Sequence, residues 1–439
     1  MAELKRTYGS FEAIGILSLY GKTVEEKQES LNKMFELNQQ SKNGKLYSRF
    51  VISLNCGKDR LSFATISGTE DMGKENGFFA HSKDDFNATR RIPYESRFDE
   101  DELADTSFND YIYVGLERGT NPVTNKAYTI GKKFLSPYDA INYIAQTIGD
   151  NQVLHIRGKI DYSVYKGKVQ VRKNITSITL AYNNKGQIPT QEEYFSTFKE
   201  ILLLDINSCP NQEDGGLYPI NAYVNIDYLD NKGVRSIVTA PRTIYASKTE
   251  IPKWIESIVP KYLRPQSPLD IWVAEIMGHY SYSRVETEDA NILELADPVK
   301  YPQFADLISM YQDGLVSEDE LVGKMVVSNK SKETALFSRP STIYDKTTEK
   351  DVLNIDKQKY KMSDLNFLEV KDEDTLSPSQ EAEINQAFSQ SVFGKTAPSP
   401  LQGTKFGKQA PANVNTSNIG EQESFDITSD DYEEFFKKD

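Results

Sequence analysis

The stretch QVLHIRGKIDYSVYKGKVQVRKNITSITL, residues 152–180, decides how this 439-residue chain is interpreted. Apolar and polar side chains alternate on both sides of a central turn at Tyr165, Lys166 and Gly167. Such alternation predicts two strands with one buried and one exposed face, and a short glycine-containing turn between them predicts a hairpin. The stretch therefore predicts an antiparallel hairpin within a β-rich fold.

Two more elements are predicted before this hairpin. The segment LYSRFVISLNCGKDRLSFATI, residues 46–66, predicts a first hairpin that turns at Gly57 and places Phe50, Ile52 and Leu54 on an apolar face. The segment SPYDAINYIAQTIGD, residues 136–150, predicts a helix capped by Ser136. The charged stretch 69–110 between them is rich in Gly, Asn and Asp, and is expected to form insertion loops rather than core.

The same order of elements recurs later in the chain. Residues 217–241 predict a hairpin, residues 250–263 a short helix, and residues 270–284 a strand. Aligning Gly158 with Gly278 brings similar neighbours together on the two glycine-bearing strands. A hairpin, a helix and a glycine-bearing strand thus appear twice, which favours duplication of one module, although chance similarity remains an alternative.

A strand hairpin, a long connection, a helix and a closing hairpin are the order of the oligonucleotide-binding (OB) barrel. The predicted fold class is therefore mainly β with minor α: two OB-fold-like barrels, a small helical appendage and a disordered C-terminal tail. We predict an OB-like module with loop insertions at 1–185, a second at 195–290, a helical or mixed appendage at 291–370, and a disordered acidic tail at 371–439.

Composition narrows the possible functions. The net charge is −14, but thirteen acidic and six basic residues place −7 of it in residues 371–439, so local basic faces can exist elsewhere. Cys56 and Cys209 are expected to be free thiols, and the three histidines lack ligand spacing, so neither a metal nor another cofactor is predicted. Without a secretory core or an apolar stretch of about 20 residues, the protein is expected in the cytoplasm.

The central hairpin carries cations and aromatic rings together. A positive groove that follows phosphates and rings that stack on bases are the two devices that hold single strands. Residues of both first-module hairpins are therefore predicted to contact DNA: Tyr47, Arg49, Arg60, Phe63, Arg157, Lys159, Tyr162, Tyr165, Lys166, Lys168, Arg172 and Lys173. The alternative is that the lysines only keep an exposed strand from pairing with other chains.

The second module offers a weaker set of the same residue types, and several of its members could equally belong to the core or to turns. Its candidates are Tyr228, Arg235, Arg242, Tyr245, His279, Tyr280, Tyr282 and Arg284.

The end of the chain, FDITSDDYEEFFKKD, combines acidic and aromatic side chains. Acidic peptides with rings dock into basic, apolar pockets of partner proteins, whereas a purely solubilising tail needs no clustered rings. The predicted partner-binding residues are Asp430, Asp431, Tyr432, Glu433, Glu434, Phe435 and Phe436.

Barrel modules, a linker with Gln, Asn, Pro and Gly, and an acidic tip bearing Phe435 and Phe436 resemble the single-stranded DNA-binding proteins of bacteria and large bacteriophages. The resemblance covers the layout of the chain rather than a diagnostic motif. It implies that the basic, aromatic barrel face holds DNA and that the tip recruits replication, recombination and repair proteins, in a host cytoplasm if the chain is phage-encoded. In the bacterial proteins the tail ends with a Phe, and partner proteins bind its terminal carboxylate. In this chain Phe436 is followed by Lys437, Lys438 and Asp439, so a dedicated partner is expected.

Motifs for phosphate-loop, nucleophile-elbow or zinc-hydrolase chemistry are missing from the sequence, so no enzymatic activity is predicted, and a nuclease built on scattered carboxylates is the enzymatic alternative. The main hypothesis is a sequence-independent single-stranded DNA-binding protein of unknown oligomeric state. The alternative is a virion or assembly protein with structural β modules.

Overall fold

The structure of the chain is a computed structural model. It describes residues 3–19, 21–41, 44–85, 87–120, 127–165, 168–211, 216–229, 234–284, 305–313, 315–316, 331–346 and 349–368. These residues belong to one compact unit, Met1–Gly394. The predicted tail and its motif lie outside the described residues.

The first five barrel strands close into a ring. The strands are β1 (Gly9–Ile16), β3 (Leu46–Cys56), β4 (Asp59–Thr69), β9 (Val153–Tyr165) and β10 (Lys168–Leu180). Their neighbours follow the order β1-β3-β4-β10-β9-β1, in which β4 and β10 run parallel and the other pairs antiparallel. Helix α3 (Pro137–Thr147) stands between the third and fourth strands, and Ser136 caps it as predicted. This is the connectivity of an OB barrel.

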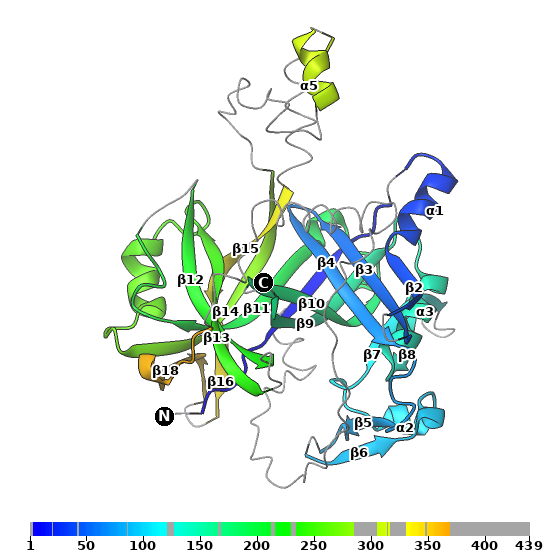
Figure 1. The fold of residues 1–439 in the computed structure, drawn as a ribbon, viewed down its shortest axis with the longest axis horizontal. Coiled ribbons are helices and arrows are strands. Elements are labelled where there is room, and N and C mark those ends of the chain that lie inside the picture. The colour runs from blue at the N-terminus through cyan, green and yellow to red at the C-terminus, as the bar shows by residue number, and fades with distance from the viewer. Residues whose placement is uncertain are drawn as a thin grey trace. The chain divides into compact units, whose positions relative to one another are not determined.

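A second ring repeats this connectivity (Figure 1). Its strands are β11 (Phe195–Leu204), β12 (Leu217–Leu229), β13 (Arg235–Ser247), β14 (Asp270–Arg284) and β15 (Ser331–Pro340). β13 and β15 are parallel, and the π-helical segment η3 (Trp254–Leu263) again lies between the third and fourth strands. The mainly β fold and the repeated order of elements are thus confirmed.

The predicted boundary at residue 290 needs correction, because β15 belongs to the second ring but lies within the range assigned to an appendage. Residues 285–330 separate β14 from β15, and this span includes helix α5 (Ala305–Gln312). So long an insertion inside the closing hairpin removes the short-turn signal on which hairpin prediction depends.

The remaining elements are insertions and additions to the rings. They are α1 (Val24–Asn32), β2 (Phe35–Gln40), β5 (Phe78–His81), β6 (Thr89–Ile92), η1 (Tyr94–Ser96), α2 (Glu100–Ala104), β7 (Ile112–Thr120), β8 (Ala127–Phe134), η2 (Gln191–Glu193), β16 (Thr342–Asp345), β17 (Lys350–Leu353), β18 (Ile355–Lys361) and η5 (Met362–Asp364).

The two rings are joined through their first strands. β1 pairs antiparallel with β11, and Phe11 lies opposite Phe198 in this pairing. Both rings contribute to one hydrophobic core cluster, which contains Phe50 and Ile156 of the first ring and Ile220 and Trp254 of the second. The rings therefore share a continuous core, as two subunits of a symmetric dimer would.

The stretch 69–110 differs from the prediction of core-free loops. Strands β5 and β6 and helix α2 lie together in Figure 1. Their buried Phe78, Ile92 and Leu103 form a hydrophobic cluster separate from the main core, which Leu135 after β8 also joins. Gly, Asn and Asp in this stretch supply tight turns inside a small folded insertion, and that is why composition alone suggested loops.

Candidate nucleic-acid interface

The two hairpins with predicted DNA contacts are neighbours in the first ring. Ala64 of β4 pairs with Lys173 of β10, and Thr65 pairs with Asn174. Asn174 in turn lies opposite Lys159 on β9. Because paired residues point to the same side of a sheet, Thr65, Asn174 and Lys159 form one row on the outside of the ring.

Phe63 interrupts the regular alternation of β4. The register shifts between Ile52 and Leu54 on the partner strand, and Phe63 itself has a φ of 55°. The left-handed backbone region is unfavourable for a bulky residue, so the surrounding bulge has to hold it there; the amide of Phe63 donates a hydrogen bond to Ser53 Oγ at 3.1 Å. The ring is 48% exposed instead of joining Leu61 in the core.

Exposed cations lie on β10, which pairs with β4, and on β9, the next strand around the ring. Lys159 on β9 and Arg172 on β10 are both exposed. Arg172 lies opposite Asp161, the acidic residue of the central hairpin. Asp161 accepts a hydrogen bond from Asn174 at 2.6 Å and pairs with Arg6 at 3.2 Å, so a second cation offsets its charge.

The segment before β1 adds groups that sequence reasoning missed. The Arg6 guanidinium lies 5.0 Å from the centre of the Tyr8 ring, and that ring is 44% exposed. Basic and aromatic residues at 5–8 were the available signal, but no strand was predicted there to place them beside the central hairpin.

Arg157 is half-buried and takes part in an ion pair. Its Nε lies 2.9 Å from Glu12 Oε1, and His155 Nε2 lies 2.6 Å from the same oxygen. Burial alone would raise the pKa of Glu12, but hydrogen bonds and charges from His155 and Arg157 outweigh burial and lower that pKa. Arg157 therefore supplies less net charge to the outer surface than its residue type suggested.

Three predicted residues of the first hairpin lie at its outer side and are half-buried: Tyr47, Arg49 and Arg60. Arg49 lies 3.9 Å from Glu36 of β2. Burial, followed by the charge of Glu36, raises the pKa of Tyr47. Arg60 lies on β4 like Phe63, whereas Tyr47 and Arg49 lie on β3, next to the acidic Glu36.

Two predicted contact residues lie in the interior instead. Tyr162 is 3% exposed and donates a hydrogen bond to the buried Glu200 at 2.7 Å. Lys173 is 7% exposed, forms an ion pair with Glu333 of β15, and lies 4.0 Å from the centre of the Tyr280 ring. A covered ring cannot stack on a base and a covered ammonium cannot reach a phosphate, so both belong to the junction between the rings.

Three predicted residues at the hairpin tip remain without a structural description of their side chains. The backbones of Tyr165 and Lys168 pair with each other. Lys166 and the tail residues 430–436 lie outside the described residues. Their predicted roles stay predictions.

The second-module candidates are mostly engaged elsewhere. Arg242 binds Glu200 through two nitrogens at 2.8 and 2.7 Å. Tyr280 is 2% exposed, and His279 lies 3.6 Å from Glu250. Arg235 is exposed and Tyr228 and Tyr245 are half-buried, whereas the side chains of Tyr282 and Arg284 are not described.

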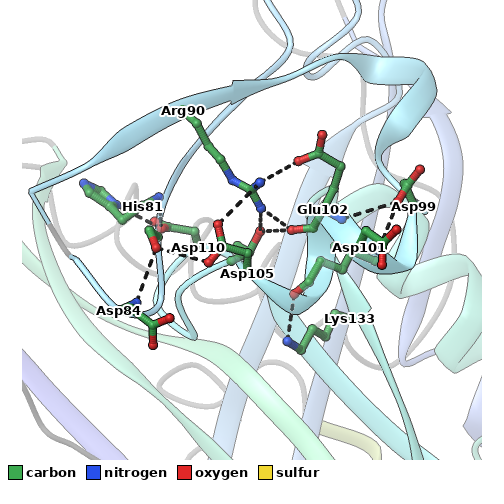
Figure 2. Close-up of polar contacts among 12 residues, drawn as sticks. His81, Asp84, Arg90, Asp99, Asp101, Glu102, Asp105, Asp110 and Lys133 are labelled. Carbon is green, nitrogen blue, oxygen red and sulfur yellow. Dashed lines mark hydrogen bonds and ion pairs between the residues drawn. The ribbon is translucent and has the colours of Figure 1, made fainter.

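The folded insertion is acidic and held together by polar contacts. Figure 2 shows Arg90 reaching Glu102 and Asp105, at 2.7 and 3.5 Å, and His81 beside Asp110 at 2.9 Å. Residues 70–111 carry twelve acidic and five basic side chains, a net charge of −7. Because residues 371–439 carry the other −7, the remainder of the chain has no net charge. Without the insertion and the tail, the rest of the chain therefore repels phosphates less than the total charge of −14 suggests.

Other site chemistry has little support in the described part of the chain. His, Cys, Asp and Glu side chains form no group of three suited to a metal ion there. Cys56 and Cys209 are free and buried, as expected for isolated thiols, and burial raises the pKa of each to about 12. Among the described helices, none has the length and apolar character needed to cross a membrane.

Comparisons with known proteins add little to this geometry. Neither protein-family models nor curated proteins give a match. Among solved structures, the chain is similar to a deletion mutant of the single-stranded DNA binding protein from Thermus aquaticus, with 7% identity and a TM-score of 0.26. The match covers 64% of this chain and 89% of the other. A similarity this low carries no argument about function.

Proposed function

We propose that this protein binds single-stranded DNA without sequence preference and catalyses no reaction. The observation that carries the proposal is the exposed Phe63, held by a strained backbone on β4, next to β10 with its exposed Arg172 and one strand further from Lys159 of β9. Strained backbone persists where the surrounding structure enforces it, and such positions cluster at ligand-binding sites.

The chemistry of the surface fits a single strand better than a duplex. A base offers a flat face that stacks on Phe63, and the adjacent phosphates meet Lys159 and Arg172. The row Thr65, Asn174 and Lys159 supplies hydroxyl, amide and ammonium groups that can contact the backbone without reading bases. Stacking contributes about 1 to 3 kcal/mol per base, and phosphate contacts make the affinity fall with salt.

Such a protein would coat transiently unwound strands during replication, recombination and repair. We further propose that the acidic residues and rings at 430–436 recruit partner proteins for these processes. This part rests on the sequence motif alone. Removing residues 424–439 should leave oligo-dT binding intact or stronger while partner recruitment is lost; if self-association fails instead, the alternative of an assembly protein is favoured.

The central test is a fluorescence anisotropy titration with labelled oligo-dT, a duplex of equal length and several salt concentrations. We expect a strong preference for oligo-dT and a steep loss of affinity with salt. Phe63→Gly should weaken oligo-dT binding about 5- to 150-fold, the equivalent of one stacked base. Glycine also accepts the left-handed backbone at this position, so the variant should fold.

The matched control is Phe79→Gly, since Phe79 is 66% exposed but lies on the acidic insertion. This variant should bind oligo-dT as the unaltered protein does. Equal affinity for duplex and single strands in the unaltered protein, or an unchanged affinity in Phe63→Gly, would overturn the proposal.

A further inference from the structure

The cores of both rings lie on one side of a four-stranded sheet that crosses their junction. This sheet has the order β9-β1-β11-β14, and all its pairs are antiparallel. Phe11 of β1 and Phe198 of β11 are buried in the core cluster that the rings share. Because successive side chains of a strand point to opposite faces, the neighbouring Ser10 and Lys199 lie on the outer face. The outer face is therefore continuous from one ring to the other.

The row of outward side chains that begins at Thr65 continues across this outer face. Lys159, the third member of the row, pairs with Ser10 of β1, and Ser10 pairs with Lys199 of β11. Lys199 pairs in turn with Met277 of β14. Lys159 is exposed, and Lys199 is half-buried. The row thus passes from the first ring to the second without a break.

The row ends on the closing strand of the second ring. The pairing of β14 with β15 places the exposed Arg339 at this end. Lys159, Lys199 and Arg339 lie on every second strand, about 10 Å apart at the usual spacing of strands. Thr65 at the other end lies two residues after Phe63 on β4. From β4 to β15 the row crosses six strand-to-strand steps, a length of about 29 Å.

The duplication places a second row beside this one, and the two rows differ in charge. In the second row Glu12 occupies the position that Lys199 holds in the first, since each follows the aligned phenylalanine of its strand by one residue. Glu12 Oε1 lies 2.9 Å from Arg157 Nε and 2.6 Å from His155 Nε2. A carboxylate at this position repels phosphates, and it engages the cations beside it. The row through Lys199 is therefore the one that suits a polyanion.

Two acidic side chains flank the row, and both accept hydrogen bonds from the protein. Asp161 accepts from Asn174 at 2.6 Å and pairs with Arg6 at 3.2 Å. Glu275 is half-buried and accepts from Asn354 at 3.1 Å. The three cations of the row and Arg6 outnumber these two carboxylates, so the face around the row attracts phosphates.

We infer that the bound single strand runs across both rings on this outer face, from Phe63 to Arg339, with Lys159 and Lys199 contacting its phosphates between them. This inference rests on the proposed function and specifies the path of the strand. The path follows one of the two rows that the duplication produced, so the two rings contact different parts of one strand and contribute unequal groups.

The first test compares charge reversals of two exposed arginines of the second ring. Arg339→Glu alters the end of the row. Arg235→Glu is the matched control, because Arg235 is about 33 Å along β13 from Tyr245, the residue of β13 that pairs with β15. We expect Arg339→Glu to weaken binding of long oligo-dT about tenfold and to flatten its salt dependence, and Arg235→Glu to change the affinity less than about twofold. Equal losses in the two variants, with urea unfolding unchanged in both, overturn the inference.

A short oligonucleotide separates the path from the surface around Phe63. Oligo-dT of about 4 nucleotides, the lower end of the site sizes of one OB barrel, is expected to occupy the Phe63 end of the row. Phe63→Gly should therefore weaken the binding of short and long oligo-dT alike, whereas Arg339→Glu should weaken only the long one. An Arg339→Glu variant that binds long oligo-dT as the unaltered protein does contradicts the path.

Lysine acetylation followed by mass spectrometry gives a readout that needs no variant. Long oligo-dT should slow the acetylation of Lys159 and Lys199 and leave that of Lys253, exposed at the start of η3, unchanged. Unchanged acetylation of Lys199 overturns this inference alone. So does slowing that appears without DNA and grows with protein concentration, because a second copy would then cover the face. Failure of the unaltered protein to bind oligo-dT overturns the proposed function together with the inference.

Discussion

The ring of Phe11 occupies the space in which a side chain at Gly158 would begin. A Cβ atom added to Gly158 would lie 2.5 Å from Phe11 Cε1 and 2.2 Å from the carbonyl oxygen of Asn174. Gly278 bears the same relation to Phe198, whose ring would be 2.4 Å from an added Cβ. The two glycines that align in the sequence thus serve one purpose, the close packing of a phenylalanine from the first strand of each ring.

Replacing Gly158 with alanine should therefore destabilise the protein. The added methyl group meets backbone and a buried ring, and overpacking of this kind costs about 1 to 3 kcal/mol in the free energy of unfolding. Urea unfolding followed by tryptophan fluorescence measures the change. Gly149→Ala is the control, because a Cβ there has its nearest neighbour at 3.7 Å. Equal stability of the two variants would contradict the packing described here.

Removing only one partner of the ion pair between Lys173 and Glu333 should lower the free energy of unfolding. Both side chains are largely buried, with 8% and 15% exposed, and Lys173 Nζ also donates to the carbonyl of Ser62 at 3.1 Å. Lys173→Met leaves Glu333 buried without its cation and should cost about 3 to 5 kcal/mol of unfolding free energy.

Adding Glu333→Gln to Lys173→Met should restore much of that stability, because the orphaned charge is removed while an acceptor for the Ser62 amide remains. Urea unfolding of both single variants and the double variant closes the cycle. Strictly additive losses would mean that the two side chains do not interact.

The lowered pKa of Glu12 predicts a loss of stability in acid. A carboxyl group whose pKa is lower in the folded than in the unfolded protein stabilises the fold above its unfolded pKa, and that contribution disappears as the pH falls through the folded pKa. Glu12→Gln should therefore be less stable than the unaltered protein at pH 7. The difference should shrink below about pH 4.5, the ordinary range of a glutamate. Unfolding curves at several pH values test this, and a difference that grows in acid would contradict it.

The buried thiols should resist alkylation until the protein unfolds. With a pKa of about 12 for both Cys56 and Cys209, about one thiol in ten thousand is ionised at pH 8, and the reagent must also reach it. Iodoacetamide should label neither cysteine in the native protein and both in urea, as counted by mass spectrometry. Rapid labelling of either thiol in the native state would show that its environment is more open than described.

The hairpins and helix of the first ring could be predicted from the sequence because their side chains alternate with clear periods. Phe50, Ile52 and Leu54 are buried as that pattern predicted, and Ile141 and Ile144 form the buried stripe of α3. Residues 9–16 gave no comparable signal, because β1 is buried between neighbours on both sides and has little alternation.

The candidate site was less accessible to sequence reasoning. Alternation places Tyr162 and Lys173 on hairpin strands but cannot reveal that the second ring covers them. Likewise, strict alternation would put Phe63 beside Leu61 in the core, and the bulge that turns it outward depends on a left-handed backbone that phenylalanine does not favour. Both outcomes are set by tertiary contacts rather than by local pattern.

The antiparallel pairing of β1 with β11 also constrains how the protein can be handled and how it can have evolved. Each first strand pairs along one edge with the other half, so a fragment ending near residue 190 would leave the β11-facing edge of β1 unmatched while its other edge stays paired with β9. Fragments of this kind are expected to self-associate, with a second copy substituting for the missing half. Fusion of the two subunits of a single-barrel homodimer into one polypeptide would produce this arrangement.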